Sequence, residues 1–364
     1  MNSIPKKIAI IGTVGVPANY GGFETLVENI IGDNCSSPNI IYTIYCSSKS
    51  YTDHKISYKN AILKYIPLEA NGIQSILYDI ISLFAASKHN DTIVILGVSG
   101  CCILPFYRLF YSKKLIINID GLEHKRNKWG KWTKKFLKFS ERMAINYGNI
   151  IITDNAGIQQ YVKEEYQKES ILIAYGGDHV ITHPSEEMTK QILHKYELEN
   201  IQYSFSVCRI EPENNIHLIL AAFSQTTQKL VFIGNWEKSE YGKQLLTKYQ
   251  AYNNIKLLSP IYDLNILNIL RSNCLFYIHG HSAGGTNPSL VEAMFFKKPI
   301  IAFDVIYNRE TTNNQANYFS NEKELISLIE KPYYLYKNNA IAMYNIANSQ
   351  YKWKTISQKY EALY

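Results

Sequence analysis

Short runs of apolar, often β-branched residues recur along the chain, and each is followed by a longer segment of mixed polar and apolar positions. The runs in the first half are KIAIIGT, NIIYTIYC, AILKYIPL, TIVILGV, KLIINID, NIIITD and SILIAYG. Continuous apolar runs of this length are typical of strands buried on both faces, and their alternation with longer amphipathic segments indicates βαβ units. The pattern therefore predicts an α/β fold with a parallel sheet between helices.

The pattern stops at AYGGDHVITHPSEE and starts again with YSFSVCRI, KLVFIGN, IKLLSP, CLFYIHG and PIIAFDV. A chain of 364 residues also suits two domains of ordinary size. The ranges that we expect are a Rossmann-like domain over 1–176, an interdomain linker over 177–200, a second Rossmann-like domain over 201–345, and a C-terminal helix over 346–364 that could cross back to the first domain. Two such domains would face a central cleft.

The segment TIVILGVSGCCILPFYRLFY, residues 92–111, is long enough to cross a membrane, which needs ~20 apolar residues. Gly97, Gly100, Pro105 and Arg108 interrupt it, so a buried strand, a turn and the start of a helix are favoured over a membrane span. The first residues, MNSIPKKIAIIGT, lack the pattern of a signal peptide, and we expect a cytoplasmic protein.

The formal net charge of +7 is compatible with an anionic partner: nucleic acid, a phosphorylated ligand or an acidic membrane surface. The six cysteines form no C-x-x-C pair and no Cys/His cluster with zinc spacing, and no D-x-D pair occurs. We therefore expect reduced core thiols, no metal site and no cofactor.

A glycine-rich segment, GTVGVPANYGGFET, follows the first predicted strand and leads into a predicted helix. Glycines at such a turn, here Gly21 and Gly22, let backbone amides approach an anion at the helix N-terminus. The segment has neither the G-x-G-x-x-G spacing of dinucleotide-binding proteins nor the G-K-[ST] of a P-loop. A tight turn without a ligand is the alternative.

In the second half, CRIEPENN follows a predicted strand and precedes a predicted helix. Arg209 stands at the carboxyl end of that strand, where ligands of open α/β sheets bind, and a guanidinium group suits a diphosphate. The alternative is a surface arginine paired with Glu211 or Glu213.

The segment HGHSAGGTNPSLVEAM, residues 279–294, joins a predicted strand to a helix in which Pro288 fits the first turn. We expect the backbone amides from Gly284 through Gly285 and Thr286 to Asn287 to face the cleft. Glu292 could accept two hydroxyl groups of a ribose. It could equally be an acidic residue that stabilises the start of a helix.

The segments GTVGVPANYGGFETLVENI, DGLEHKRNKWGKW, CRIEPENNIHLILAAF and GGTNPSLVEAM together resemble the family-4 retaining glycosyltransferases, over nearly the whole chain. Within that family they look most like the bacterial β-1,4-rhamnosyltransferases of capsule and cell-wall polysaccharide synthesis. The resemblance implies a GT-B fold in which Arg209 holds the diphosphate of a nucleotide sugar and Glu292 its ribose. Residues 284–287 would contact its sugar and phosphates.

Two positions depart from the family pattern. The first glutamate of its E-x7-E motif falls on Gly284, and the lysine that accompanies the arginine falls on Asn214. The first change disfavours an ordinary hexose and favours a 6-deoxy sugar, so dTDP-β-L-rhamnose is the expected donor. The second leaves Asn214 as a candidate contact to the nucleotide-sugar donor, and Arg209, helix amides and His281 to balance the diphosphate charge.

The strand KLIINID leads to Asp120, Glu123 and His124. Asp120 is a candidate for orienting or deprotonating the acceptor hydroxyl, and Glu123 or His124 for contacting the donor sugar. Each could instead cap local structure. Net retention, which the resemblance implies, requires no protein base if the leaving phosphate takes the acceptor proton.

Between Lys125 and Arg142, aromatic residues recur at helical spacing among lysines. Such a helix could lie on an anionic membrane at the inner face of the plasma membrane and suit a polyprenyl-diphosphate-linked Glc or GlcNAc acceptor. The alternative is an aromatic core face with a solvated lysine face. The lysines form one local cluster, which argues against a nucleic-acid partner. A UDP- or GDP-sugar donor, or a non-catalytic nucleotide-binding protein, are the alternatives for function.

Overall fold

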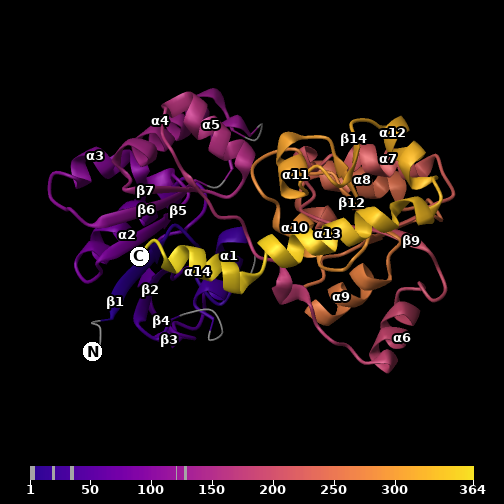
Figure 1. The fold of residues 1–364 in the computed structure, drawn as a ribbon, viewed down its shortest axis with the longest axis horizontal. Helices are drawn as coiled ribbons and strands as arrows, with labels where there is room; N and C mark the ends of the chain where they lie inside the picture. The colour runs from indigo at the N-terminus through magenta and orange to yellow at the C-terminus, as the bar shows by residue number, and fades with distance from the viewer. Residues whose placement is uncertain (1–4, 19–20, 33–36, 120, 127–128) are drawn as a thin grey trace. The chain divides into compact units, whose positions relative to one another are not determined.

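The computed structural model describes residues 5–18, 21–32, 37–119, 121–126 and 129–364. The chain divides into two compact units (Figure 1). Unit 1 contains residues 1–175 and 353–364, and unit 2 contains residues 176–352. Each unit is built around its own mainly parallel sheet.

The described residues of unit 1 form an eight-stranded sheet in the order β3-β4-β2-β1-β5-β6-β7-β8. The strands are β1 (Lys6–Ile11), β2 (Ile40–Ser47), β3 (Ser57–Tyr58), β4 (Ala61–Ile66), β5 (Thr92–Leu96), β6 (Lys114–Ile119), β7 (Ile150–Thr153) and β8 (Ile171–Leu172). All neighbours are parallel except the short β3, which is antiparallel to β4. The parallel sheet follows from the apolar runs, since every residue of β5 is buried.

The α-helices of unit 1 are α1 (Gly22–Ile30), α2 (Gln74–Ser87), α3 (Leu104–Tyr107), α4 (Lys131–Tyr147), α5 (Ala156–Tyr166) and α14 (Trp353–Glu361). The 3-10 helices are η1 (Ser99–Ile103) and η2 (Glu123–Lys125). The chain moves one way along the sheet from β1 to β2 and the other way from β4 to β7. Right-handed crossovers therefore place α1 on one face and α2 to α5 on the other.

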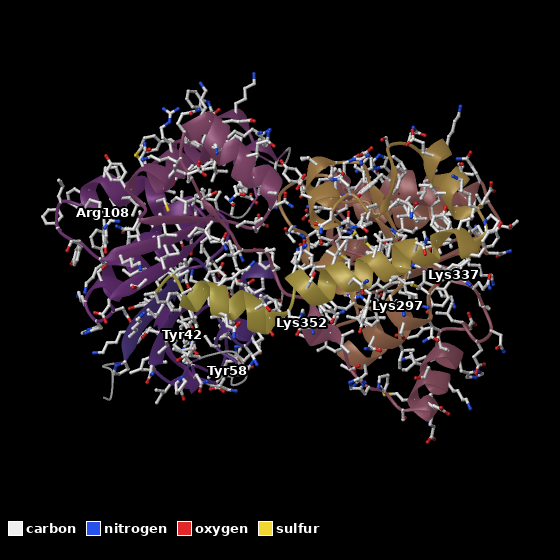
Figure 2. The ribbon with its side chains drawn as sticks, in the orientation of Figure 1. Tyr42, Tyr58, Arg108, Lys297, Lys337 and Lys352 are labelled. Carbon is white, nitrogen blue, oxygen red and sulfur yellow. The ribbon has the colours of Figure 1, made fainter. Side chains whose placement is uncertain are left out.

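Helix α14 comes from the end of the chain and packs against α1 (Figure 1). Trp353, Ile356 and Tyr360 are buried in the core of unit 1, and the Tyr360 hydroxyl accepts a 2.7 Å hydrogen bond from the Asn118 side chain. The ring of Tyr364 lies 6.0 Å from that of Tyr42, which is labelled in Figure 2. The core of unit 1 is thus completed by residues that follow unit 2 in the sequence.

Unit 2 has a parallel six-stranded sheet in the order β11-β10-β9-β12-β13-β14. The strands are β9 (Tyr203–Val207), β10 (Lys229–Ile233), β11 (Ile255–Leu258), β12 (Phe276–His279), β13 (Ile300–Phe303) and β14 (Asn317–Phe319). The α-helices are α6 (Glu186–Lys195), α7 (Ile216–Ser224), α8 (Glu240–Tyr249), α9 (Leu264–Asn273), α10 (Pro288–Met294), α11 (Ile306–Thr311), α12 (Glu322–Ile329) and α13 (Lys337–Gln350). The two Rossmann-like units confirm the predicted α/β class.

The structure assigns two segments whose sequence pattern allowed more than one interpretation. Residues 92–111 form β5, η1 and α3, which confirms the strand, turn and helix start. Among the described residues no helix combines the length and apolarity that a membrane crossing needs. Residues 177–200, expected as a linker, lie inside unit 2 and include α6, whose N-cap Ser185 accepts a hydrogen bond from the Met188 amide. The Pro and acidic cluster there marks a helix start rather than a free connection.

We predict that Trp353→Ala destabilises unit 1 by ~3–5 kcal/mol, because it removes a large side chain from a core that cannot fully close around the cavity. Urea unfolding followed by circular dichroism would measure the loss. Lys354→Ala, one residue along and exposed, is the matched control and should change stability by less than ~0.5 kcal/mol. Equal effects of the two variants would contradict the packing role of α14.

Candidate functional site

The sheet of unit 2 has a topological switch point between β9 and β12. From β9 the chain moves to β10 on one side, and β12 lies on the other. Open α/β sheets bind ligands outside the carboxyl ends of the two strands at such a point. Arg209 lies two residues beyond β9, and His281 lies two residues beyond β12. The topology therefore brings these two predicted site residues to one edge of the sheet.

The Arg209 guanidinium is accessible and loosely paired. Its side chain is 41% exposed, and Nη1 lies 3.9 Å from Oε1 of Glu211. An exposed ion pair at that distance is worth ~0–1 kcal/mol. The pairing with Glu211 that the sequence left open is therefore present but weak, and it leaves the guanidinium able to turn to a bound anion.

Asn214 ties the two strand ends together through both atoms of its amide. Its Nδ2 donates to the Arg209 carbonyl at 2.6 Å, and its Oδ1 lies 2.6 Å from Nδ1 of His281. Both side chains are buried. Because Oδ1 can only accept, Nδ1 of His281 donates, and Nε2 is an acceptor in the neutral ring. Asn214 thus positions His281. The sequence analysis predicts that Asn214 itself contacts the nucleotide-sugar donor.

More hydrogen bonds join the same two loops. The Ser282 amide and hydroxyl both donate to the Glu213 carbonyl, at 2.9 and 2.8 Å, and the Asn215 side chain donates to the Gly280 carbonyl at 2.9 Å. A Cβ at Gly280 would lie 2.1 Å from the Asn214 carbonyl oxygen, so only glycine fits. The loops after β9 and β12 form one bonded unit.

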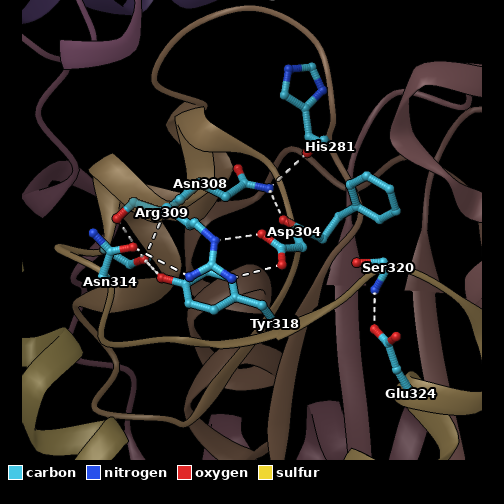
Figure 3. Close-up of polar contacts among 10 residues, drawn as sticks. His281, Asp304, Asn308, Arg309, Asn314, Tyr318, Ser320 and Glu324 are labelled. Atoms are coloured by element: carbon cyan, nitrogen blue, oxygen red, sulfur yellow. Dashed lines mark hydrogen bonds and ion pairs between the residues drawn. The ribbon is translucent and has the colours of Figure 1, made fainter.

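A second support reaches His281 from β13 and α11 (Figure 3). Asn308, which is buried, donates to the His281 carbonyl at 2.8 Å and to the Phe303 carbonyl at 2.9 Å. Arg309 and Asp304 form a two-pronged ion pair at 2.5 and 2.7 Å in the same connection. The hydrogen bonds from Arg309 lower the pKa of Asp304. The sequence analysis missed Asn308 because its contact with His281 joins residues 27 apart in the sequence.

The glycine turn leads into α10 as predicted. Gly284 has a φ of +88°, which favours glycine, and Thr286 is buried. The Asn287 side chain caps α10 by accepting from the Ser289 amide at 3.0 Å, and Pro288 occupies the first turn. Gly285 completes the turn between these residues. The side-chain oxygen Oδ1 of Asn287 therefore accepts hydrogen bonds at the start of α10.

Glu292 has a buried cationic partner that the sequence analysis did not identify. Its Oε2 lies 2.5 Å from Nη2 of Arg271, on α9, and its Oε1 lies 3.6 Å from Nε2 of His179. Arg271 is 3% exposed, and its Nε and Nη1 have no hydrogen-bond partner among the described residues. Glu292 lies in the second helical turn, so it is not the first-turn residue of the alternative reading. The available signal was an arginine within the apolar helix pattern LNILNILRSN.

In unit 1 the glycine-rich segment is held by two glutamates of α1. Glu24 Oε1 accepts from the Thr13 hydroxyl at 3.0 Å and the Val14 amide at 2.8 Å, and Glu28 accepts from the Ala18 amide at 2.6 Å. Gly21 has a φ of +144°, and a Cβ there would lie 1.9 Å from Glu24 Oε2. Gly22 is the first residue of α1. The segment is a braced turn, and the positive φ of Gly21 favours glycine there. Whether the turn binds an anion stays a prediction.

Of the three catalytic candidates after β6, Asp120 lies outside the described residues. Glu123 is engaged locally: its Oε1 lies 3.0 Å from Nε of Arg126, and its Oε2 accepts from the Trp129 indole at 3.0 Å. His124 Nδ1 lies 3.0 Å from Oε2 of Glu141, a carboxylate of α4 with a 2% exposed side chain. Glu123 and His124 are adjacent in the sequence, but their side chains have different partners.

Glu141 is the centre of a buried polar cluster. Its Oε1 accepts from the hydroxyls of Tyr161 at 2.7 Å and Tyr166 at 2.6 Å. Burial alone would raise the Glu141 pKa, but hydrogen bonds from His124, Tyr166 and Tyr161 outweigh it and lower the pKa. A carboxylate that stays charged holds the His124 ring in place through the contact at 3.0 Å.

Residues 125–142 do not form one helix. A 3-10 turn ends at Lys125, and α4 begins at Lys131 and continues to Tyr147. Trp132 is 83% exposed and Phe139 is 50% exposed, so these aromatics are not core residues. The buried face of α4 is formed by Ser140, Glu141, Ala144 and Ile145.

A pocket of about 300 Å³ opens in unit 1 near the glycine-rich segment. Pro17, Tyr51, Asp53, Lys55 and Tyr65 are among its lining residues. The Tyr51 hydroxyl donates to the Pro17 carbonyl at 3.0 Å, which joins the pocket to the turn after β1. Aromatic side chains beside polar groups suit a sugar.

The described residues contain no group of three or more His, Cys, Asp or Glu side chains placed to hold a metal ion.

Comparisons with known proteins agree with this division of the chain. Residues 187–351 match the family model for glycosyl transferases group 1, and residues 5–178 match a domain of unknown function, DUF1972. The first of these matches lies within unit 2. Comparison with curated protein sequences gave no match.

Solved structures show the same fold over the full chain. Sucrose-phosphate synthase from Thermosynechococcus elongatus superposes with a TM-score of 0.81 at 14% identity, covering 99% of this chain and 98% of that one. HepE from Anabaena, in complex with UDP-glucose, gives 0.74 at 13% identity, covering 98% and 99%. Trehalose 6-phosphate synthase from Burkholderia multivorans gives 0.69 at 8% identity, covering 99% and 98%. The chain has the GT-B fold.

We predict that Arg271→Met lowers the free energy of unfolding of unit 2 by ~3–5 kcal/mol, because it leaves Glu292 partly buried without its cation. The double variant Arg271→Met/Glu292→Gln should recover most of that loss. A double-mutant cycle in urea, with Glu292→Gln as the second single variant, measures the coupling. If the stability losses of the two single variants add up in the double variant, Arg271 and Glu292 have no coupling energy.

His279 provides a pH prediction. Burial lowers its pKa to about 3, so folding favours the neutral ring. The stability that this contributes is complete above the unfolded value of about 6.5 and is lost as pH falls towards 3, at up to ~1.4 kcal/mol per pH unit. Chemical unfolding at several pH values should show a shallower acid loss for His279→Gln. His183→Gln, at an exposed position, is the control and should keep the parent slope. Identical slopes for parent and His279→Gln would contradict the assignment.

Proposed function

We propose that the protein is a retaining glycosyltransferase that uses a nucleoside-diphosphate sugar as donor. The observation that carries the proposal is the bonded pair of loops at the switch point of a group 1 glycosyl transferase domain, with the accessible Arg209 beside the positioned His281. A guanidinium suits a diphosphate at this sheet edge, and so does an imidazole whose Nε2 donates when the ring is protonated. The HepE structures hold UDP and UDP-glucose, which supports a nucleotide-sugar donor here.

The donor that we propose is dTDP-β-L-rhamnose. Gly284 stands where related enzymes have a glutamate, so no side-chain carboxylate at that position meets the hydroxyls of the sugar. A 6-deoxy sugar has one hydroxyl fewer to satisfy. UDP- and GDP-sugars are the alternatives within the same reaction class, and a non-catalytic nucleotide-binding protein is the alternative outside it.

In the proposed reaction the acceptor oxygen bonds to C1 of the sugar as the bond from C1 to the diphosphate oxygen breaks, on the same face. The acceptor proton passes to the leaving phosphate oxygen, so charge balance needs no protein base. Arg209 stabilises the developing negative charge on the diphosphate, and His281 does so when its ring is protonated, because Nε2 then donates as well. No cofactor or metal is proposed. Glu292, held by Arg271, binds the ribose.

The acceptor that we propose is a polyprenyl-diphosphate-linked Glc or GlcNAc, at the inner face of the plasma membrane, in synthesis of a capsule or cell-wall polysaccharide. The pocket beside Tyr51 and Tyr65 is the proposed site for its sugar, and α4 offers membrane contact through the exposed Trp132 and lysines. His124, positioned by Glu141, contacts the donor sugar. No nucleic-acid partner is proposed.

The test is transfer to a synthetic lipid-diphosphate-linked Glc or GlcNAc from a panel of nucleotide sugars, with products identified by mass spectrometry. We expect one added deoxyhexose with dTDP-L-rhamnose, and transfer that persists in EDTA. Arg209→Gln should lower kcat/KM by about a hundredfold, because a group that meets the diphosphate charge is lost. Lys243→Gln, an exposed cation of α8 paired with Glu240, is the matched control and should retain activity.

Each other result has a distinct meaning. Transfer only from a UDP- or GDP-sugar would overturn the inference from Gly284 and keep the reaction class. Loss of transfer in EDTA would overturn the metal-free mechanism. Nucleotide-sugar binding without transfer to either acceptor would favour the non-catalytic alternative.

A further inference from the structure

Helix α9 carries an arginine whose guanidinium is buried against Glu292, the proposed ribose contact. The Arg271 side chain is 3% exposed, and its Nη2 lies 2.5 Å from Oε2 of Glu292. Its Nε and Nη1 are buried and have no hydrogen-bond partner among the described residues. The face of the Phe296 ring lies beside the guanidinium, with Cζ 5.8 Å from the ring centre. Glu292 therefore supplies the counter-charge that the structure gives this buried cation, through Oε2.

The segment that faces the other oxygen of Glu292 is fixed to the same helix. This segment is the 3-10 helix η3 (Asp178–Val180) with the residues that follow it. The side-chain amide of Asn268, one turn before Arg271 in α9, donates to the carbonyls of Val180 at 3.3 Å and Thr182 at 3.1 Å. Helix α9 thus positions both groups that lie against the Glu292 carboxylate.

The second oxygen of Glu292 has a weaker contact. Its Oε1 lies 3.6 Å from Nε2 of His179, in η3, and the two side chains are 16% and 22% exposed. A separation of 3.6 Å is too long for a direct hydrogen bond. A Cβ at Gly177 would lie 3.1 Å from the Glu292 amide nitrogen, so η3 packs closely on α10. Oε1 is therefore the oxygen that a ligand can take without breaking the contact with Arg271.

The availability of the two oxygens decides how many sugar hydroxyls Glu292 can accept. A ribose presents neighbouring hydroxyls at C2′ and C3′, which can pair with the two oxygens of one carboxylate. A 2′-deoxyribose presents the C3′ hydroxyl alone. Binding both hydroxyls across the carboxylate would draw Oε2 from Arg271 and leave a buried guanidinium without its counter-charge, which is strongly unfavourable. Binding one hydroxyl at Oε1 keeps the ion pair intact.

We infer that Arg271 makes the nucleotide site selective for 2′-deoxyribonucleoside diphosphates. The guanidinium occupies Oε2, and Glu292 accepts the C3′ hydroxyl through Oε1. A C2′ hydroxyl would lie beside the occupied oxygen and lose its hydrogen bond to water without gaining an acceptor. Arg271 does not touch the nucleotide; it is a positioning residue that sets what Glu292 can bind. The ribose contact of Glu292, on which this rests, belongs to the proposed function.

This selectivity bears on the choice among the proposed donors. A dTDP-sugar carries 2′-deoxyribose, whereas UDP- and GDP-sugars carry ribose. The Arg271–Glu292 contact therefore favours the dTDP-sugar for a reason that is separate from the residue at position 284. From the sequence, Glu292 was expected to accept two hydroxyls; with Oε2 held by Arg271, we expect one.

Isothermal titration calorimetry of the full-length protein with nucleoside diphosphates tests the selectivity without sugar transfer. Three thymine nucleotides differ only in the sugar: 5-methyluridine diphosphate has both hydroxyls, dTDP has the C3′ hydroxyl, and 3′-deoxythymidine diphosphate has neither. We expect dTDP to bind about tenfold more tightly than each of the others, since one buries an unpaired hydroxyl and the other loses a hydrogen bond. UDP and 2′-deoxy-UDP repeat the comparison with another base.

Arg271→Met should remove the preference. With Oε2 released, Glu292 can accept both hydroxyls, so the dissociation constant of 5-methyluridine diphosphate divided by that of dTDP should fall from about ten to about one or below. A role in stability alone would weaken both nucleotides alike and leave this ratio unchanged.

The double variant Arg271→Met/Glu292→Gln removes the uncompensated charge and should also give a ratio of about one, because the freed amide can meet both hydroxyls. It replaces the single variant if circular dichroism shows that Arg271→Met is unfolded. Lys323→Met, which removes a cation from an exposed position of α12, is the matched control and should keep the parent ratio.

Equal or tighter binding of the ribonucleotides by the parent, or a ratio that the Arg271 variants leave unchanged, would overturn the inference. Sugar transfer is measured in parallel. The expected preference without transfer would overturn the transferase function alone, and transfer without the preference would overturn this inference alone. No binding of any nucleotide would overturn both.

Discussion

The amide of Asn214 is the contact on which the candidate site of unit 2 depends. One side chain satisfies the Arg209 carbonyl beyond β9 and the His281 ring beyond β12. A lysine, which has no acceptor, could not make both bonds. Asn214 therefore makes a fixed connection where the family pattern has a lysine, and in the proposed function the charge that meets a diphosphate comes first from Arg209.

The same principle of buried polar support recurs around this site. Arg271 and Glu292 form a pair in which the cation is almost fully buried, and removal of either partner would leave the other without compensation. Glu24 and Glu28 play the corresponding part in unit 1, where backbone amides of the glycine-rich segment donate to them. In each case a carboxylate maintains local geometry, and Glu292 is also a candidate ligand from the sequence.

The strands, their parallel order and the helix starts were predictable because burial on both faces and N-caps leave local signals, as in β5 and the Pro288 turn. Arg209 and His281 were predictable because each follows a strand. Arg271, Asn308 and Glu141 were not, because their roles depend on partners brought close by tertiary packing. The helix expected over residues 125–142 was wrong in its start, because regularly spaced aromatic residues do not show where a helix begins. Helix α4 begins at Lys131.

The return of the chain to unit 1 makes unit 2, in effect, a domain inserted into another. During synthesis on a ribosome, all of residues 176–352 emerge before Trp353, Ile356 and Tyr360 can enter the core of unit 1. Unit 2 can fold first, although domains of a chain commonly fold from the N-terminal side. Until then unit 1 lacks this part of its core, and the apolar surface that α14 covers is exposed to solvent.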